Sequence, residues 1–583
     1  MTTTATTDPE MSVGERPRSW SGVWSVGAVV LGSGLILWAA VNQPYNQNEL
    51  VQIAPYGSNS IAEIVGATRQ PPLGPLLGAM FQHLLGEGHL RQRLVPVGSG
   101  IGTLVVTALL MRRLGLGAAG AFGLWVLATA PLMVRFSAYT RPYALPLFLM
   151  VLFLFAAQRW IDTRRRAWLL MAALAAVALP LARVPEPTAF LLMAAGVLLV
   201  LGVARRLTWA QTLPLVVISL GALVLVGYAM FRALASDASG YFDLSPSGVI
   251  SRLGPGAGEL TTGFLPLLAD WLPWWPITVL VVVLAVALPG PRRVLTRWWF
   301  VWPLSAAPVA FALAYHFLGT VSFEVLPYRP RAAYFFVVPY VWVVVALATL
   351  VTRASAGSRG MRIGVAALLC GALLGQLPAT ASVVLRNGAP DFDQAGDVVA
   401  GSVPEAAVVL YDRPEPAPQS RMSFLAKPRF LPAQPPVLEV SKVARHPRRL
   451  PPGAPVYLLV NGQCAQPGLC TPFSAGEFRE PVPGWRVVEQ FDRFTLYEPV
   501  NGQSGRVGAI EGLRALGSIL GPELGYTETF AAASLLELRG RTAEGRQAVR
   551  QMYAAAPPGV RERIEMVAGS YAWTDVDRRP GTD

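Results

Sequence analysis

Long apolar stretches alternate with short polar connections from the beginning of the chain to about residue 385. The first stretch, Trp20 to Ala40, can cross a bilayer as a helix, because about 20 residues at a rise of 1.5 Å cover a hydrocarbon core of about 30 Å. The pattern predicts a polytopic α-helical membrane protein with about eleven such spans. After the first span, the others are expected at 94–111, 117–134, 143–160, 167–181, 188–204, 213–231, 271–288, 298–318, 334–351 and 363–384.

Clustered arginines indicate the orientation of these spans. Every second connection carries such a cluster, for example Arg112-Arg113, Arg164-Arg165-Arg166 and Arg205-Arg206. Cytoplasmic loops are typically enriched in Lys and Arg. The N-terminus is therefore expected in the cytoplasm, and an odd number of spans places the C-terminal part on the opposite side. Cys464 and Cys470 bracket only Ala-Gln-Pro-Gly-Leu and are close enough to form a disulfide, which would also lie outside the cytoplasm.

The composition changes to that of a soluble domain at Arg386. The segments 406–411, 455–460 and 485–497 have the pattern of short strands between turns. Ala531 to Pro557 has the pattern of one helix–turn–helix repeat. The expected domains are a disordered cytoplasmic segment (1–19), a transmembrane domain (20–385), an extracytoplasmic α/β domain (386–505) and a helical C-terminal segment with a mobile tail (506–583).

Composition and charge argue against several classes of function. The chain is 53% hydrophobic and 14% charged, whereas a soluble protein of this size would need a more charged surface. Its net charge of +13 is spread over the loop clusters, and no basic run alternates with aromatic residues, which argues against a nucleic-acid partner. The four histidines lack metal-ligand spacing, so a divalent metal is not supported and no cofactor is firmly implied. The chain also has no phosphate-binding loop of the GxxxxGK type.

Polar residues predicted at the outer ends of the spans are the candidates for chemistry. Glu49 follows the first span, and a carboxylate held beside lipid headgroups can act as a base. Arginines bind phosphate groups with a forked geometry. Such a site suits a lipid-phosphate substrate and a hydroxyl acceptor. The competing interpretations are a solvated loop acid for Glu49 and headgroup anchoring for the arginines. The arginine and tyrosine candidates are Arg69, Arg141, Tyr143, Arg329 and Arg331, with Gln70 beside them.

Three of these segments, in order and spacing, resemble a known family. They are Glu49, the run Arg69-Gln70-Pro71-Pro72-Leu73, and the segment from Phe136 to Leu145, FSAYTRPYAL. They resemble the C superfamily of membrane glycosyltransferases (GT-C), in particular the protein-mannosyltransferase-like branch with bacterial lipid-A and rhizobial lipopolysaccharide transferases. The resemblance covers roughly residues 20 to 385. It implies transfer of a sugar, with inversion, from a polyprenyl-phosphate-linked donor to an extracytoplasmic hydroxyl of a glycan, lipid or protein.

The resemblance also implies roles for single residues. Glu49 matches the second residue of the family's acidic pair, the proposed base or acceptor-orienting group. Arg141 and Tyr143 match the segment that faces the donor phosphate, and Arg329 and Arg331 lie near the place of an Arg-Tyr pair.

Three positions depart from the family's pattern. Asn48 stands where the family has Asp, Gln70 where His is common, and Ala333 where Arg is frequent. A single carboxylate still suffices for a general base, but the losses leave a catalytically silent scaffold as an alternative. A transporter or flippase for lipid-linked sugars is a second alternative, although it would need polar groups along the spans and an internal repeat. The Arg- and Ala-rich, Lys-poor composition points to a bacterial plasma membrane.

Overall fold

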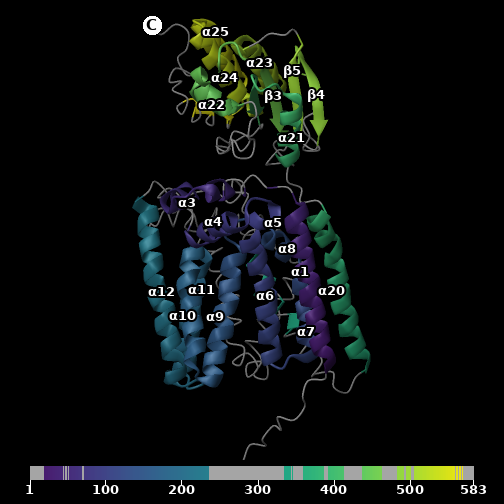
Figure 1. The fold of residues 1–583 in the computed structure, drawn as a ribbon, viewed down its shortest axis with the longest axis vertical. Coiled ribbons are helices and arrows are strands. Elements are labelled where there is room, and N and C mark those ends of the chain that lie inside the picture. Colours follow the sequence, from purple (N-terminus) through teal and green to yellow (C-terminus); the bar gives the residue numbers. More distant parts are fainter. Residues whose placement is uncertain are drawn as a thin grey trace, which may run out of the picture. The chain divides into compact units, whose positions relative to one another are not determined.

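The chain divides into two compact units. The computed structural model describes residues 19–43, 45, 49, 52–68, 71–235, 359–385, 392–412, 436–461, 482–491, 494–500 and 505–558, with isolated positions in 334–345 and 560–568. One unit comprises Met1–Gln43 and Pro55–Asn387 and is called the helical unit here. The other comprises Pro44–Ala54 and Gly388–Asp583 and is called the C-terminal unit. Figure 1 labels the elements of both.

The helical unit confirms the polytopic helical fold predicted from the hydrophobic pattern. Four of the described helices are long and apolar enough to cross a membrane, and they are α1 (Ser19–Asn42), α6 (Leu94–Arg113), α9 (Ala144–Thr163) and α11 (Pro185–Val203). Three further helices coincide with predicted spans, namely α10 (Arg166–Ala182), α12 (Trp209–Ala235) and α20 (Arg359–Leu385). The predicted spans 271–288 and 298–318 lie outside the described residues. The total of eleven stays a prediction.

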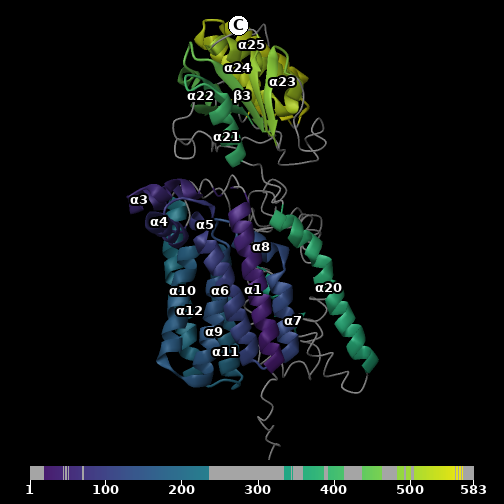
Figure 2. The ribbon, with the colours of Figure 1, turned by 45° about the vertical axis from the view of Figure 1, so that its right-hand side comes forward.

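One predicted span is not a single helix. The stretch 117–134 forms α7 (Gly117–Ala128) and α8 (Pro131–Ser137), which are bent by 57° relative to each other. Pro131 has no N–H to continue the helical hydrogen bonds, and the N–H of Ala130 donates to Leu127 O instead of Val126 O, so carbonyl groups around the bend need other donors. Helix α20 supplies them. Gln376 Nε2 donates to Val126 O at 3.0 Å, and Thr380 Oγ1 donates to Thr129 O at 2.5 Å. Figure 2 shows α20 beside α1 and α8.

Short helices lie across one end of the helical unit. Between α1 and α6 the chain forms a 3-10 turn, η1 (Ala54–Gly57), and the helices α3 (Ile61–Thr68), α4 (Leu73–Leu85) and α5 (His89–Gln92). Figure 1 shows α3, α4 and α5 at the end where α1 stops and α6 starts. We call this the α3–α5 end. The opposite end, where α6 and α9 stop, carries Arg112, Arg113 and Arg164 to Arg166 and is called the basic end.

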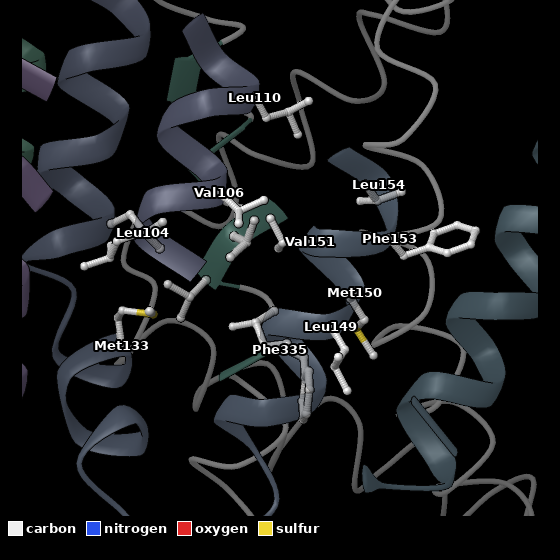
Figure 3. Close-up of a cluster of buried hydrophobic side chains, with 14 of the residues drawn as sticks. Leu104, Val106, Leu110, Met133, Leu149, Met150, Val151, Phe153, Leu154 and Phe335 are labelled. Carbon is white, nitrogen blue, oxygen red and sulfur yellow. The ribbon is translucent and has the colours of Figure 1, made fainter. Parts of the chain in front are cut away.

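Apolar side chains gain little free energy by moving from lipid into the protein interior. The helices of a membrane protein are therefore held together by close packing. Figure 3 shows the buried cluster between α6, α8 and α9, with Leu104, Met133, Val151 and Phe335 among its members. Small residues allow the backbones to approach closely. A Cβ added at Gly100 of α6 would lie only 2.3 Å from the side chain of Ser137, the last residue of α8.

The C-terminal unit contains a five-stranded sheet in the order β2-β1-β3-β5-β4. Strands β1, β2 and β3 are parallel, with Val409 opposite both Val437 and Tyr457, and β5 is antiparallel to both β3 and β4. The predicted strand 485–497 is two paired strands, and β2 is a strand that the sequence pattern did not predict. The strands are β1 (Val408–Asp412), β2 (Val437–Glu439), β3 (Val456–Asn461), β4 (Trp485–Phe491) and β5 (Phe494–Pro499).

The sheet and the last three helices share one core. Leu458 and Tyr497 of the sheet belong to the same buried cluster as Leu513, Phe530 and Leu535. The expected helix–turn–helix corresponds to α24 and α25. Two hydrogen-bonding arginines hold the pKa of Glu544 on α25 below its ordinary value, mainly through Arg514. The helices are α21 (Phe392–Ser402), α22 (Val440–Arg445), the 3-10 turn η4 (Pro447–Arg449), α23 (Gly505–Leu524), α24 (Tyr526–Leu538) and α25 (Thr542–Ala555).

Candidate functional site

Three of the predicted site residues are described by the structure, namely Glu49, Arg141 and Tyr143. The remaining ones lie outside the described residues, so their roles stay predictions. These are Asn48, Arg69, Gln70, Arg329 and Arg331, together with Cys464 and Cys470 of the predicted disulfide.

Glu49 is a buried residue with 0% of its surface exposed. It lies in the short segment Pro44–Ala54, which groups with the C-terminal unit although it directly follows α1 in sequence. Removing a carboxylate from water is costly unless it gains partners or a function. The interpretation of Glu49 as an acid solvated in a loop therefore does not describe its surroundings.

Arg141 and Tyr143 lie in the turn that connects α8 to α9. We call residues 138 to 143 the 138–143 turn. The N–H of Arg141 donates to Tyr139 O at 2.7 Å, and the N–H of Tyr143 donates to Arg141 O, also at 2.7 Å. Each hydrogen bond spans only two residues, as in γ-turns. The turn leaves Arg141 half-buried and Tyr143 buried at the start of α9.

Aromatic rings pack around Tyr143. Its ring centroid lies 5.2 Å from that of Phe136 in an edge-to-face arrangement and 6.4 Å from that of Tyr139 in a stacked one. Phe136 also contacts Tyr334, with their ring centroids 5.1 Å apart. Both geometries are favourable for aromatic pairs. The last turn of α8 and the first residue before α9 are thus joined through side chains.

An ion pair that the sequence analysis did not single out lies against the same ring. Arg183 Nη2 donates to Glu186 Oε1 at 2.8 Å, and Arg183 Nε contacts the other carboxylate oxygen, which makes the pair bidentate. The side chains are 18% and 3% exposed. Arg183 Cζ lies 4.9 Å from the centre of the Tyr143 ring, within cation–π distance. In the sequence, this pair is visible as one Arg and one Glu in the short connection between α10 and α11, which carries no arginine cluster.

Buried polar groups also tie the short helices of the α3–α5 end to the spans. Arg93 is fully buried, and its Nη1 donates to Ala40 O at 2.9 Å and to Gln43 O at 2.7 Å, at the end of α1. Gln92 Nε2 donates to Gln82 Oε1 of α4 at 3.0 Å. Thr140 Oγ1 in the 138–143 turn donates to Gln92 O at 3.4 Å. The 138–143 turn is therefore connected to α5, and through it to α4.

The side chains of the 138–143 turn are of a kind that can contact an anion. A half-buried arginine in a fixed turn, flanked by tyrosine rings, offers forked N–H donors to an anion. Over the described part of the chain, no three His, Cys, Asp or Glu side chains come together as the ligands of a metal ion would.

Comparison with known proteins finds similar solved structures, two of which are described here, and no sequence relative. No family model and no curated protein matches the chain. The crystal structure of ArnT from Cupriavidus metallidurans bound to undecaprenyl phosphate is 16% identical, with a TM-score of 0.45, and the match covers 83% of this chain and 98% of that one. The apo structure of the same protein is 15% identical, with a TM-score of 0.46 and coverage of 82% and 98%. The likeness thus runs along most of both chains.

Proposed function

We propose that this chain is an integral membrane glycosyltransferase of the GT-C type. It transfers a sugar from a polyprenyl-phosphate-linked donor to an acceptor hydroxyl outside the cytoplasm, on a cell-envelope glycan, a lipid or a protein. The observation that carries the proposal is the complete burial of the Glu49 carboxylate directly after the first span. The resemblance of residues 20 to 385 to that superfamily supports it, and so does the fixed 138–143 turn with its arginine.

In the proposed reaction, Glu49 is the general base. The acceptor hydroxyl donates a hydrogen bond to the Glu49 carboxylate and attacks the anomeric carbon of the donor sugar. A new bond forms between the acceptor oxygen and that carbon, while the bond from the carbon to the phosphate oxygen breaks on the opposite face. The hydroxyl proton passes to Glu49, and polyprenyl phosphate leaves with the bonding electrons. This displacement inverts the configuration at the anomeric carbon.

Arg141 and Tyr143 are assigned to the leaving phosphate. Negative charge grows on the phosphate oxygens as the bond to the sugar breaks, and donors that are already oriented stabilise it without reorganisation. The backbone of Arg141 is held by the short hydrogen bonds of the 138–143 turn, so its side chain starts from a fixed point of the chain. Arg329 and Arg331 would complete the binding site for this phosphate. The proposal assigns no step to a metal or a cofactor.

A transfer assay with a matched pair of variants tests this mechanism. Membranes with wild type, Glu49→Gln or Glu63→Gln are incubated with a panel of radiolabelled polyprenyl-phosphate sugars. Glutamine keeps the size of the buried side chain but cannot accept the proton, so we expect transfer to fall by about 10²- to 10⁴-fold. Glu63 is an exposed acid on α3 and serves as the control that keeps its activity. Full transfer by Glu49→Gln would contradict the mechanism.

One sequence feature favours a second candidate function. Asn48 stands in place of the first acid of the family's pair, which is compatible with a scaffold that binds donor lipid without turnover. Wild-type protein that binds polyprenyl-phosphate sugars but transfers none of them, with any acceptor fraction, would select the scaffold.

A further inference from the structure

We infer that the Arg183–Glu186 ion pair is a positioning element for the donor phosphate. It fixes the ring of Tyr143 and, through that ring, the shape of the 138–143 turn that presents Arg141. The inference rests on the proposed function, since it assigns the pair to the binding of the donor phosphate in that reaction. Arg183 and Glu186 act here through Tyr143, and neither is assigned a contact with the substrate.

The 138–143 turn depends on side chains for its shape. It follows the last helical residue of α8 and precedes the first of α9. The N–H of Ala138 still donates to Val134 O, and Tyr143 O still accepts from the N–H of Leu147, but the backbone between Ala138 and Tyr143 is not helical. The turn's own backbone hydrogen bonds span two residues each and leave the direction of the side chains undetermined. The packing of Tyr143 against its neighbours therefore decides where the turn points.

The ion pair provides a fixed surface for that packing. Two parallel contacts hold the guanidinium plane of Arg183 to the carboxylate of Glu186. Glu186 lies in the first turn of α11, where the helix dipole favours a negative charge. A pair this little exposed persists because each charge neutralises the other, and removing one partner leaves the second buried and uncompensated.

Tyr143 transmits this constraint to the turn. The guanidinium of Arg183 lies 4.9 Å from the ring centre, while Phe136 and Tyr139 contact the same ring. The ring is thus held between the α10–α11 connection and the end of α8. Loss of the cation would let the ring rotate, and the backbone two residues from Arg141 would follow.

A second ion pair of the helical unit provides the matched control. Arg113 Nε lies 3.1 Å from Asp162 Oδ2 at the basic end, where it joins α6 to α9. Both pairs belong to the helical unit, although Arg183–Glu186 is a local pair three residues apart at the start of α11. The control pair lies at the far end of α9, about 30 Å from Tyr143 at a rise of 1.5 Å per residue. A general loss of helix packing would affect both pairs alike.

The test measures donor binding and kinetics on the full-length protein in lipid nanodiscs. Glu186→Gln, Arg183→Lys and the control Asp162→Asn are compared with wild type. We expect kcat/KM for the donor to fall by about 10- to 100-fold in the first two, because small misplacements of a binding group have effects of this size. The KM for the acceptor and all values for Asp162→Asn stay near those of wild type. Binding of undecaprenyl phosphate, the probe without a sugar, should weaken in parallel.

A double variant separates positioning from a purely structural role. If the ion pair acts through the ring, Glu186→Gln combined with Tyr143→Leu loses no more donor binding than the greater of the single losses. The inference would be overturned if the double variant showed the product of the two single losses of donor binding. It would also be overturned if the variants of the ion pair had a lower Tm but bound the donor as wild type does. If wild type binds the probe but transfers no sugar, the catalytic proposal fails, and the binding data still decide the role of the pair. If wild type does not bind the probe, both fail.

Discussion

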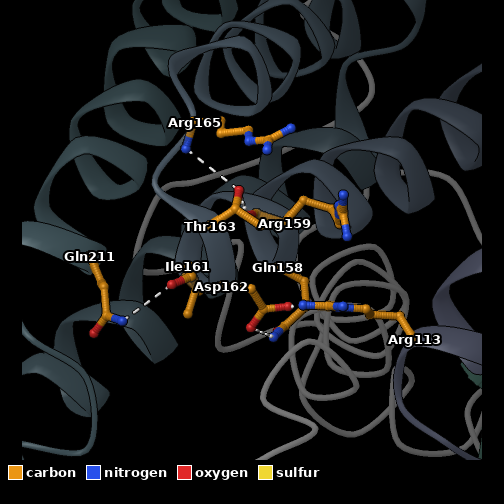
Figure 4. Close-up of polar contacts among 8 residues, drawn as sticks. All are labelled: Arg113, Gln158, Arg159, Ile161, Asp162, Thr163, Arg165 and Gln211. Carbon is orange, nitrogen blue, oxygen red and sulfur yellow. Dashed lines mark hydrogen bonds and ion pairs between the residues drawn. The ribbon is translucent and has the colours of Figure 1, made fainter.

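The two ends of the helical unit use charged residues in opposite ways. At the basic end the charges are partly exposed. Arg113 and Asp162 are 44% and 25% exposed in their ion pair, and Gln158 donates to the same carboxylate at 3.0 Å (Figure 4). At the α3–α5 end exposed charges such as Glu63 occur as well, but two charged groups are enclosed. Arg93 is fully buried, and Glu186 is 3% exposed beside its arginine.

Under the proposed function, the difference separates the arginines predicted to set topology from the charges assigned to the site. Exposed arginines at a membrane boundary cost little, and a neighbouring tryptophan ring can hold them there, as with Arg164, whose Cζ lies 5.3 Å from the Trp160 ring centre. Enclosed charges remain only where the fold supplies their partners. Clusters that stand out in the sequence therefore report orientation, whereas the residues assigned to the site occur singly.

Among the packing and charge variants of the helical unit, the largest loss of transfer is expected when a side chain is added at the contact between α6 and α8. In Gly100→Ala the new Cβ would lie 2.3 Å from the Ser137 side chain, so α8 must move, and the 138–143 turn with it. We expect a loss of about 1 to 3 kcal/mol in stability, typical of overpacking, and at least about a tenfold loss of transfer. Gly98 on the same helix has open space around it, so Gly98→Ala is the control. Equal behaviour of the two variants would show that the α3–α5 end tolerates displacement.

A smaller effect is expected at the bend between α7 and α8. Gln376→Leu removes donors to Val126 O and Thr129 Oγ1, the latter a bond of 2.7 Å. Leaving such groups without their donor costs about 1 to 3 kcal/mol. The Tm of the purified protein should fall accordingly, and transfer should decline less than in Gly100→Ala. Gln158→Leu, which removes an exposed hydrogen bond at the basic end, is the reference and should leave the Tm nearly unchanged.

The smallest effect is expected from the exposed ion pair at the basic end. Asp162→Asn should change stability by less than about 1 kcal/mol, and less at high salt, because exposed pairs are screened by ions. Thermal unfolding at low and high salt checks this. If Asp162→Asn lowered the stability as much as Glu186→Gln does in the same measurement, the distinction between the two ends would be wrong.

Much of the helical unit was predictable from hydrophobic length alone. Trp20 to Ala40 and 94–111 coincide with α1 and α6 because hydropathy measures what the bilayer requires. The bend at Pro131 was missed because the stretch around it is apolar throughout, and hydropathy does not detect a missing hydrogen bond. In the C-terminal unit, 485–497 was read as one strand because its pattern continues through the connection between β4 and β5.

The site was predictable only in part. Short motifs indicated Glu49, Arg141 and Tyr143, but the pattern could not say whether Glu49 is solvated or buried. The Arg183–Glu186 pair escaped notice because two opposite charges in a short connection usually remain in water. Its meaning depends on the ring of Tyr143, some forty positions earlier in the chain, and only the folded arrangement brings these groups together.

The hydrogen bonds from α20 to the bend between α7 and α8 have a consequence for biosynthesis. The carbonyl groups of Val126 and Thr129 enter the membrane early, whereas Gln376 and Thr380 are translated about 250 residues later. At the roughly 5 to 20 residues per second of translation, that interval lasts tens of seconds or less. Until α20 is inserted, the nascent chain must satisfy these carbonyls with water or transient neighbours. Insertion of α20, the last helix of the unit, thus completes the hydrogen bonding of the bend between α7 and α8, which is one of the earliest parts of the unit to be made.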